Sequence, residues 1–276
     1  AQHIIETEEK IIPKEKTILN KEKKVTNNLV EAVTTLNQVA KTIRKKRINS
    51  GAIIFDKSEI KFKLDEKNKP KEVVFKTAKS ANKLIEEFML LANRKVAEKM
   101  KKGKERFVFR VHDQPDEEKL KNLQTVVKRL GYNLDLKKNN LNDSLNTLLE
   151  NTFGKNEQNL IDTLMIRSMS KAEYTTKNIG HYGLAFDNYT HFTSPIRRYP
   201  DVLVHRLIEA ELKNEKIKTE ELETLCNHST HMEILATKAE RDSIKLMQIK
   251  YMLDKEGKIF EAVISGVTAR GVFVEV

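Results

Sequence analysis

The sequence predicts an α+β fold in which helices predominate and the strands are few and short. Three long stretches, 25–46, 78–101 and 219–253, carry apolar residues at helical spacing. The stretch 59–77 alternates apolar and polar residues, turns and returns in the same pattern, which predicts a β-hairpin. We therefore expect mixed β-strands in a mostly helical body.

The first part of the chain alternates between helical and extended patterns. The helix predicted over 25–46 ends in basic residues and stops near Gly51, a residue that suits a helix C-terminus. Short apolar runs predict strands at 52–55 and 59–64. The second of these strands is expected to return through 71–77 after a lysine-rich turn.

The second part of the chain is expected to be mainly helical after one more strand. Phe107 to Val111 predicts that strand, and a helix that begins near Pro115 is closed by Gly131. The remaining expected elements are helices from Leu141 and Gln158, a strand or extended loop at 181–186, a helix after Ser194 and the long helix at 219–253.

Composition favours a polyanionic partner. The formal net charge is +11, and a basic protein of this size is drawn to polyanions. Most of the excess is lysine spread over helices and turns, which is usually a solvated surface, so charge alone is a weak argument. The single cysteine, Cys226, excludes an internal disulfide framework. It favours a cytoplasmic protein, and the lack of any apolar run of membrane-spanning length predicts no membrane contact. We also expect the protein to be a monomer.

The most informative stretch runs from Tyr189 to Ile208. Ser194 followed by Pro195 predicts a helix start, with a hydroxyl N-cap and then a residue that needs no N–H partner. The free N–H groups and the positive dipole of such a terminus bind phosphate, and Arg197 and Arg198 add guanidinium forks. The alternative is an ordinary capped helix with solvated arginines. We favour an anion site because two arginines, two hydroxyls and an aromatic residue gather at one helix entrance.

These residues resemble a known family. HFTSPIRRYPD followed by VHRLI is similar to the signature of the RNase II/RNase R exoribonucleases, most closely the bacterial RNase R branch. Four further segments resemble the same catalytic domain in the same order: LIEEFMLLANRKVAE, FRVHDQPDEEKL, IRSMSKAEY and NIGHYGLAF. The stretch from Gly257 to the end resembles the first hairpin of the OB-fold RNA-binding domain that follows it.

The resemblance implies a division of the chain. Residues 1–256 are expected to form the C-terminal part of an RNase II/R-type catalytic domain, and 257–276 the truncated start of a C-terminal OB-fold RNA-binding domain. Members of this family carry closely spaced aspartates that bind two magnesium ions, and no comparable segment occurs in this sequence. We therefore interpret the chain as a fragment without metal ligands of its own, and expect the magnesium-binding segment upstream.

The resemblance also implies an activity. The parent protein is expected to be a 3′-to-5′ hydrolytic exoribonuclease that degrades single-stranded RNA to nucleoside 5′-monophosphates with magnesium. The fragment alone is expected to be inactive. Arg197 is the expected catalytic residue, because its planar fork would meet the scissile phosphate and offset charge in the transition state.

The RNA-binding residues are implied by the same resemblance. Phe55 is expected to stack on the last bases at the 3′ end. Glu86 or Glu87 is expected to contact the sugar and base of the terminal nucleotide, and the choice between them stays open. Glu240 is expected near the RNA strand, although it could equally pair with basic neighbours on its own helix. The other expected RNA-binding residues are Arg167, His191, Thr193, Ser194, Arg198, Tyr199 and Phe273.

Two other functions remain open at this stage. The first is a non-catalytic RNA-binding scaffold of the same fold. The second is a basic helical interaction domain that binds a protein or the ribosome. Salt-dependent binding to single-stranded RNA, weaker for DNA, would argue against the interaction domain.

Overall fold

The computed structural model describes residues 1–8, 27–55, 59–103, 106–137, 141–216, 219–253, 255–268 and 271–275. Its α-helices are α1 (Gln2–Glu8), α3 (Asn27–Asn49), α4 (Ser80–Met100), α5 (Glu117–Arg129), α6 (Leu141–Thr152), α7 (Gln158–Ser168), α8 (Tyr199–Lys213) and α9 (Leu222–Leu253). Its strands are β1 (Glu59–Leu64), β2 (Pro70–Lys76), β3 (Phe109–Val111), β4 (Glu173–Thr175), β5 (Val263–Thr268) and β6 (Gly271–Glu275).

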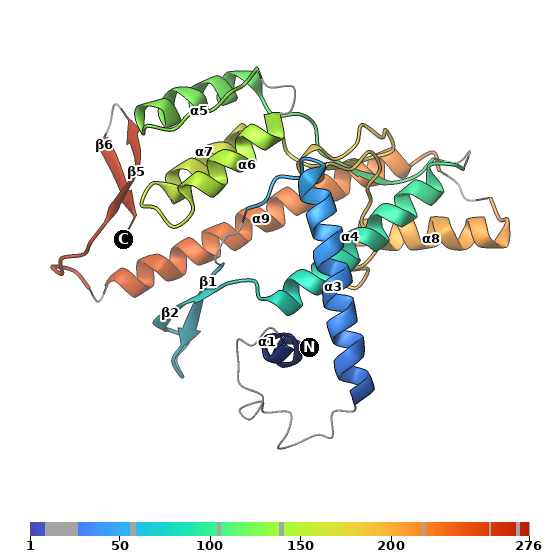
Figure 1. Cartoon of the computed structure of the whole chain (residues 1–276), viewed down its shortest axis with the longest axis horizontal. Helices are drawn as coiled ribbons and strands as arrows, with labels where there is room; N and C mark the ends of the chain where they lie inside the picture. The colour runs from blue at the N-terminus through green and yellow to red at the C-terminus, as the bar shows by residue number, and fades with distance from the viewer. Residues whose placement is uncertain are drawn as a thin grey trace.

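The described strands pair as three separate two-stranded antiparallel sheets, β1–β2, β3–β4 and β5–β6. Helices supply most of the remaining structure, so the predicted α+β class is confirmed. In Figure 1, α9 runs lengthwise through the molecule, α5, α6 and α7 lie together beyond one side of it, and α3 crosses α4. The hairpins β1–β2 and β5–β6 lie near the C-terminal end of α9 (Figure 1).

The helices expected from Leu141 and Gln158 are confirmed, but the strand expected at 52–55 is wrong. Two backbone N–H groups of this segment donate to other parts of the chain, Ala52 to the Arg47 carbonyl at 3.2 Å and Ile53 to the Gly183 carbonyl at 3.0 Å. The carbonyls that precede Ile53 accept instead from the side-chain amides of Asn142 and Asn146, at 2.6 and 2.9 Å. Side chains of α6 therefore supply the hydrogen bonds that a neighbouring strand would otherwise make to this segment, and no β-ladder forms.

Three apolar clusters hold the described elements together. The first lies between the end of α4, the strand β3, and the facing sides of α8 and α9, with Val204 and Cys226 fully buried. The second joins α5, α6 and α7, and takes in Ile53. The third joins α1, α3 and the start of α4 through Ile5, Ala40 and Leu84. Because α4 contributes to the first and third clusters, it connects two cores.

The first turns of α9 are clamped onto the β3–β4 pair. Thr230 accepts the backbone N–H of Tyr174 at 2.9 Å, and Glu233 forms an ion pair with Arg110 at 2.6 Å. Along α9, only Leu222, Cys226 and Ser229 are buried among the side chains described, and these lie near its start. The rest of the helix extends beyond this core.

The terminal hairpin is present as predicted, with β5 and β6 antiparallel and β5 in contact with α7. A domain boundary between 256 and 257 stays a prediction. Among the residues described, no helix has both the length and the apolar character needed to cross a membrane.

Candidate functional site

The segment before α8 forms a tight turn instead of the first turn of the helix, so the expected helix start at Ser194 is wrong. Arg198 occupies the N-cap position and the helix begins at Tyr199. The Ser194 carbonyl accepts the N–H groups of Arg197 and Arg198 at 3.3 and 3.1 Å, which closes a separate turn. Pro200 then falls in the first helical turn, where a missing N–H costs nothing.

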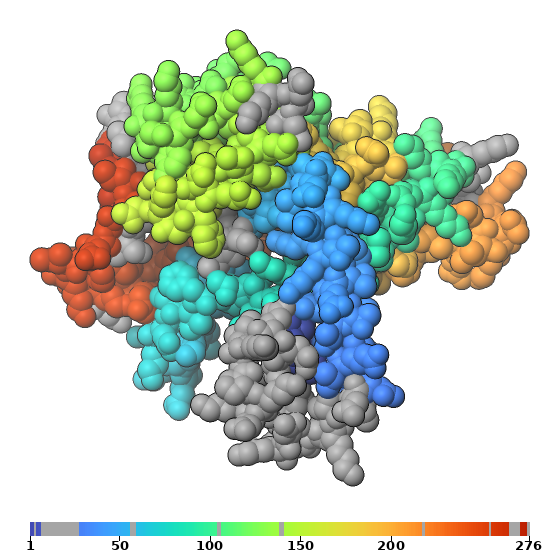
Figure 2. Space-filling model, in the orientation of Figure 1, coloured from blue at the N-terminus to red at the C-terminus, as the bar shows by residue number. Residues whose placement is uncertain are grey.

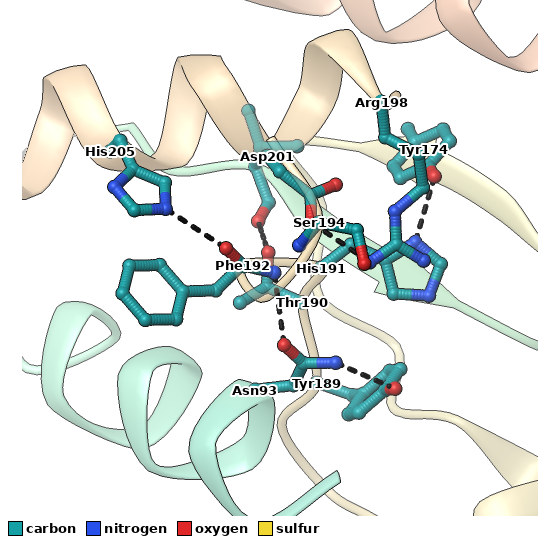
Figure 3. Close-up of polar contacts among 11 residues, drawn as sticks. Asn93, Tyr174, Tyr189, Thr190, His191, Phe192, Ser194, Arg198, Asp201 and His205 are labelled. Atoms are coloured by element: carbon teal, nitrogen blue, oxygen red, sulfur yellow. Dashed lines mark hydrogen bonds and ion pairs between the residues drawn. The ribbon is translucent and has the colours of Figure 1, made fainter. Parts of the chain in front are cut away.

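Asp201 explains why the turn and the helix are separate. Its side chain is fully buried and accepts the Ser194 N–H at 2.7 Å and an N–H of the Arg198 guanidinium at 2.8 Å (Figure 3). The carboxylate thus fixes the serine backbone and one arginine at the same point. A buried charge needs such partners, because burial without them is costly.

Asn93 on α4 holds the other end of the loop. Its side-chain oxygen accepts the Phe192 N–H at 2.9 Å, and its side-chain nitrogen donates to the Tyr189 hydroxyl at 3.1 Å (Figure 3). The Thr190 hydroxyl donates to the Val108 carbonyl at 2.8 Å. Asn93 is itself buried, so the geometry of the loop is set by the core and not by solvent.

His205 supports the loop from α8. Its ring is stacked on that of Phe192, with centroids 4.3 Å apart. Its Nε2 lies 2.9 Å from the Phe192 carbonyl, which can only accept, so this nitrogen carries a proton.

Within this turn, the exposed arginine and the buried polar groups without hydrogen-bond partners together favour the binding of an anion. Arg197 is exposed, whereas the Arg198 side chain is only 18% exposed. Three buried polar atoms have no hydrogen-bond partner among the described residues, namely Thr193 Oγ1, Arg198 Nε and Asp201 Oδ2. Two of these are N–H or O–H groups that could donate to a phosphate oxygen. Two guanidinium groups against one carboxylate leave the turn with a net positive charge.

Neutral imidazoles line the interior beside the turn. Burial, followed by the charges of Arg198 and Arg110, lowers the pKa of His191 to about 2. Burial lowers the pKa of His181 to about 3. His191 Nδ1 lies 2.8 Å from the Tyr174 hydroxyl, so the ring has a hydrogen-bond partner while uncharged. Both rings are therefore uncharged at neutral pH, and the buried His181 Nδ1 has no hydrogen-bond partner among the described residues.

The stability of this region should fall in acid. The unfolded chain binds protons at His181 and His191 below about pH 6.5, whereas the folded chain does not until much lower pH. Each histidine therefore lowers the free energy of unfolding by about 1.4 kcal/mol per pH unit below that value. Urea unfolding between pH 7 and pH 5 measures the slope, which His191→Gln should reduce. The exposed His228→Gln is the matched control, and equal slopes for both variants would contradict the expectation.

Phe55 and Glu86 line neighbouring cavities that share lining residues. Phe55 is half-buried and lines two adjoining cavities of about 490 and 510 Å³. Glu86 lines the second of these and also a cavity of about 440 Å³ that contains Tyr189 and Arg198. Glu86 thus lies between Phe55 and the arginine turn.

Glu87 is placed differently from its neighbour. Its side chain is 1% exposed and accepts from the Arg47 guanidinium at 2.5 and 3.3 Å and from Arg44 at 3.4 Å. This ion pair occupies the carboxylate inside the protein. Of the two glutamates that the sequence left open, only Glu86 faces a cavity.

Of the expected RNA-binding residues, Phe55, Glu86 and Arg198 line these cavities. Glu87, His191, Thr193 and Ser194 line none of them, and the remaining four lie elsewhere. Arg167 is exposed at the end of α7, Glu240 is exposed on α9, and Phe273 is 60% exposed on β6. Tyr199 is 47% exposed and lines a separate cavity of about 440 Å³ between α8 and α9. None of the four lines a cavity that contains Phe55 or Arg198.

Sequence reasoning missed Asn93 and Asp201, although both lie in motifs that were recognised. Asn93 ends the EEFMLLAN segment and Asp201 ends RRYPD. A polar residue inside an apolar helical pattern, and an acid next to two arginines, were the signals that could have identified them.

The described residues do not fit a metal ion. Within them, no group of three or more His, Cys, Asp or Glu side chains is arranged to hold one. We therefore derive no chemical step through magnesium from this part of the molecule.

Comparison with known proteins decides the family. A sequence profile of the RNB domain matches residues 1–214, which is most of the chain. The chain belongs to the RNB domain family. Ribonuclease R of Aquifex aeolicus (strain VF5) is 37% identical to it over 251 residues, covering 90% of this chain and 36% of that protein. Ribonuclease R of Escherichia coli (strain K12) is 35% identical over 259 residues, covering 89% and 32%.

This RNB chain therefore spans about a third of the length of these curated relatives. It is also similar to a solved structure, Mycoplasma genitalium RNase R in complex with ribose-methylated single-stranded RNA. The two share 27% identity with a TM-score of 0.82, over 92% of this chain and 41% of that one. The predicted resemblance to the RNase R branch is confirmed.

Proposed function

We propose that this RNB chain holds the RNA in a 3′-to-5′ hydrolytic exoribonuclease, which degrades single-stranded RNA to nucleoside 5′-monophosphates. The proposal is supported by the RNB match and by relatives that are named Ribonuclease R. It is supported further by the structural similarity to an RNase R bound to single-stranded RNA. In this proposal the protein acts as a cytoplasmic monomer.

One observation carries the proposal: a single face of α4 connects the Phe55 cavities to the arginine turn. Lys83, Glu86 and Asn93 lie at helical spacing on that face. Lys83 lines the Phe55 cavities, Glu86 lines one of these and the Arg198 cavity, and Asn93 lines the latter. Each helical residue rises about 1.5 Å, so Lys83 and Asn93 lie about 15 Å apart along the helix axis.

The roles follow from this arrangement. A base at the 3′ end stacks on Phe55, which is sequence-blind because every base has a π-face. Glu86 accepts a hydrogen bond from a ribose 2′-hydroxyl, which distinguishes RNA from DNA.

The arginine turn receives the phosphates. Thr193 and Ser194 position them, while the exposed Arg197 fork meets the scissile phosphate and offsets the charge that develops there. Arg198 has a different role, because Asp201 already occupies part of its guanidinium. It supports the turn and adds positive charge.

Magnesium is part of the proposal, with ligands outside the described residues. When bound, it would activate a water for attack on the terminal phosphodiester. The residues of this chain hold and orient the RNA.

Digestion of single-stranded RNA labelled at its 3′ end tests the proposal. The full-length gene product with magnesium should release a labelled nucleoside 5′-monophosphate, and this chain alone should release none. A DNA oligonucleotide of the same sequence is the control and should stay intact. If the full-length product binds the RNA but releases no mononucleotide, the non-catalytic scaffold is the better description.

A further inference from the structure

We propose that the cavities around Phe55 form a nucleotide subsite with a second aromatic wall, Phe153, and a phosphate contact, Arg44. This inference rests on the proposed binding of single-stranded RNA and adds two residues to it. Phe55, Phe153, Arg44 and Lys83 each line both adjoining cavities, which measure about 490 and 510 Å³.

Phe153 is presented to solvent by a rigid support. Its side chain is 68% exposed, although it directly follows α6. The preceding residue, Thr152, is fully buried, and its hydroxyl donates to the Leu148 carbonyl at 3.0 Å. The exposed position of the ring is therefore fixed by the end of a packed helix. A large apolar ring held at the mouth of a cavity suits stacking with a planar base.

The charge around the second cavity identifies the kind of ligand. Arg44, Arg47 and Lys83 line it, against a single carboxylate, Glu86. Behind the wall, Glu87 is bound to both arginines, so one of the two guanidinium charges remains uncompensated. The cavity is therefore positive, which suits a phosphate.

The side chains of Arg44 and Arg47 differ in how far they are exposed to solvent. The Arg47 side chain is 6% exposed and forms the short contacts to Glu87. The Arg44 side chain is 19% exposed and lies 3.4 Å from the same carboxylate. Arg44 is thus the one that a phosphate reaches.

The first cavity is less suited to an anion. Glu150 and Asp162 line it together with Arg44 and Lys83, so its charges balance. A base and its sugar suit this side, and the phosphate suits the other. In Figure 2 the surfaces of α6–α7 (yellow-green), α3 (blue) and the β1–β2 hairpin (cyan) face the same side of the molecule, so the RNA would approach from there.

Binding of a single-stranded RNA oligonucleotide to the full-length gene product, followed by fluorescence anisotropy over a range of salt concentrations, tests the subsite. Phe153→Ala should lower the affinity about tenfold, with an unchanged salt dependence. Its effect should vanish for an abasic oligonucleotide of the same length. Arg44→Gln should lower the affinity and reduce the salt slope by about 1.

Phe75→Ala is the matched control, because Phe75 is 67% exposed and lines neither cavity. If the wild-type protein binds RNA and Phe153→Ala matches this control, the subsite is wrong and the proposed function stands. An equal loss on normal and abasic RNA would also overturn the stacking role. If the wild-type protein does not bind RNA, both the subsite and the proposed function fail.

Discussion

Arg197→Lys in the full-length gene product should lower the rate of mononucleotide release by about 10²- to 10³-fold, the loss typical of removing one well-placed transition-state donor. Lysine keeps the positive charge but loses the planar fork that binds two phosphate oxygens at once. Arg197 is exposed at the turn, so the substitution disturbs no buried partner. Single-turnover digestion of labelled RNA measures the rate, and RNA affinity should change much less than the rate.

Arg206→Lys provides the matched control for this substitution. Arg206 is also exposed, but it lies on α8 and lines the separate cavity between α8 and α9. Its replacement should leave the rate near that of the wild type. Full turnover by Arg197→Lys would show that Arg197 does not act on the scissile phosphate.

Asp201→Ala should lower the free energy of unfolding by about 3–5 kcal/mol, the usual cost of removing one partner of a buried ion pair. The loss leaves the largely buried Arg198 guanidinium without its carboxylate and the Ser194 N–H without its acceptor. Urea unfolding, followed by circular dichroism, measures the change. Asp187→Ala is the control, because Asp187 is exposed in the same loop.

A double substitution distinguishes the effect of the lost ion pair on stability from the effect of lost packing. Replacing both partners, with Arg198→Met and Asp201→Leu, removes both charges and should recover part of the stability, since no uncompensated buried charge remains. A double variant less stable than Asp201→Ala would indicate that packing, and not charge, accounts for the loss.

The helices were predictable because their signals are local. Apolar spacing placed α6 and α7 at their observed starts, and Gly131 follows α5 in the left-handed conformation that a glycine tolerates. The failures came from partners distant in sequence. The segment 52–55 resembles a strand in isolation, but side chains from α6 satisfy it. Its conformation could not be predicted from its own residues.

The sequence predicted which residues belong to the candidate site better than it predicted how they are arranged. The resemblance selected Arg197 and Phe55, and the structure adds how the turn and the cavity around them are supported. The resemblance could not distinguish Glu86 from Glu87, because adjacent helical residues have similar local signals. The choice depends on Arg47, forty positions away along the chain, which occupies one carboxylate and leaves the other at the cavity.

The length of α9 has a mechanical consequence. A helix of 32 residues is about 48 Å long. One end is fixed to the β3–β4 ladder through Thr230 and Glu233, and near the other end the Tyr251 ring lies 6.3 Å from that of Phe62. The helix is therefore held near its start, and a bend of about 5° at Glu233, about 30 Å from the C-terminal end, would displace that end by roughly 3 Å. One inserted residue would rotate everything beyond it by about 100°, which would turn the terminal hairpin away from its contact with α7.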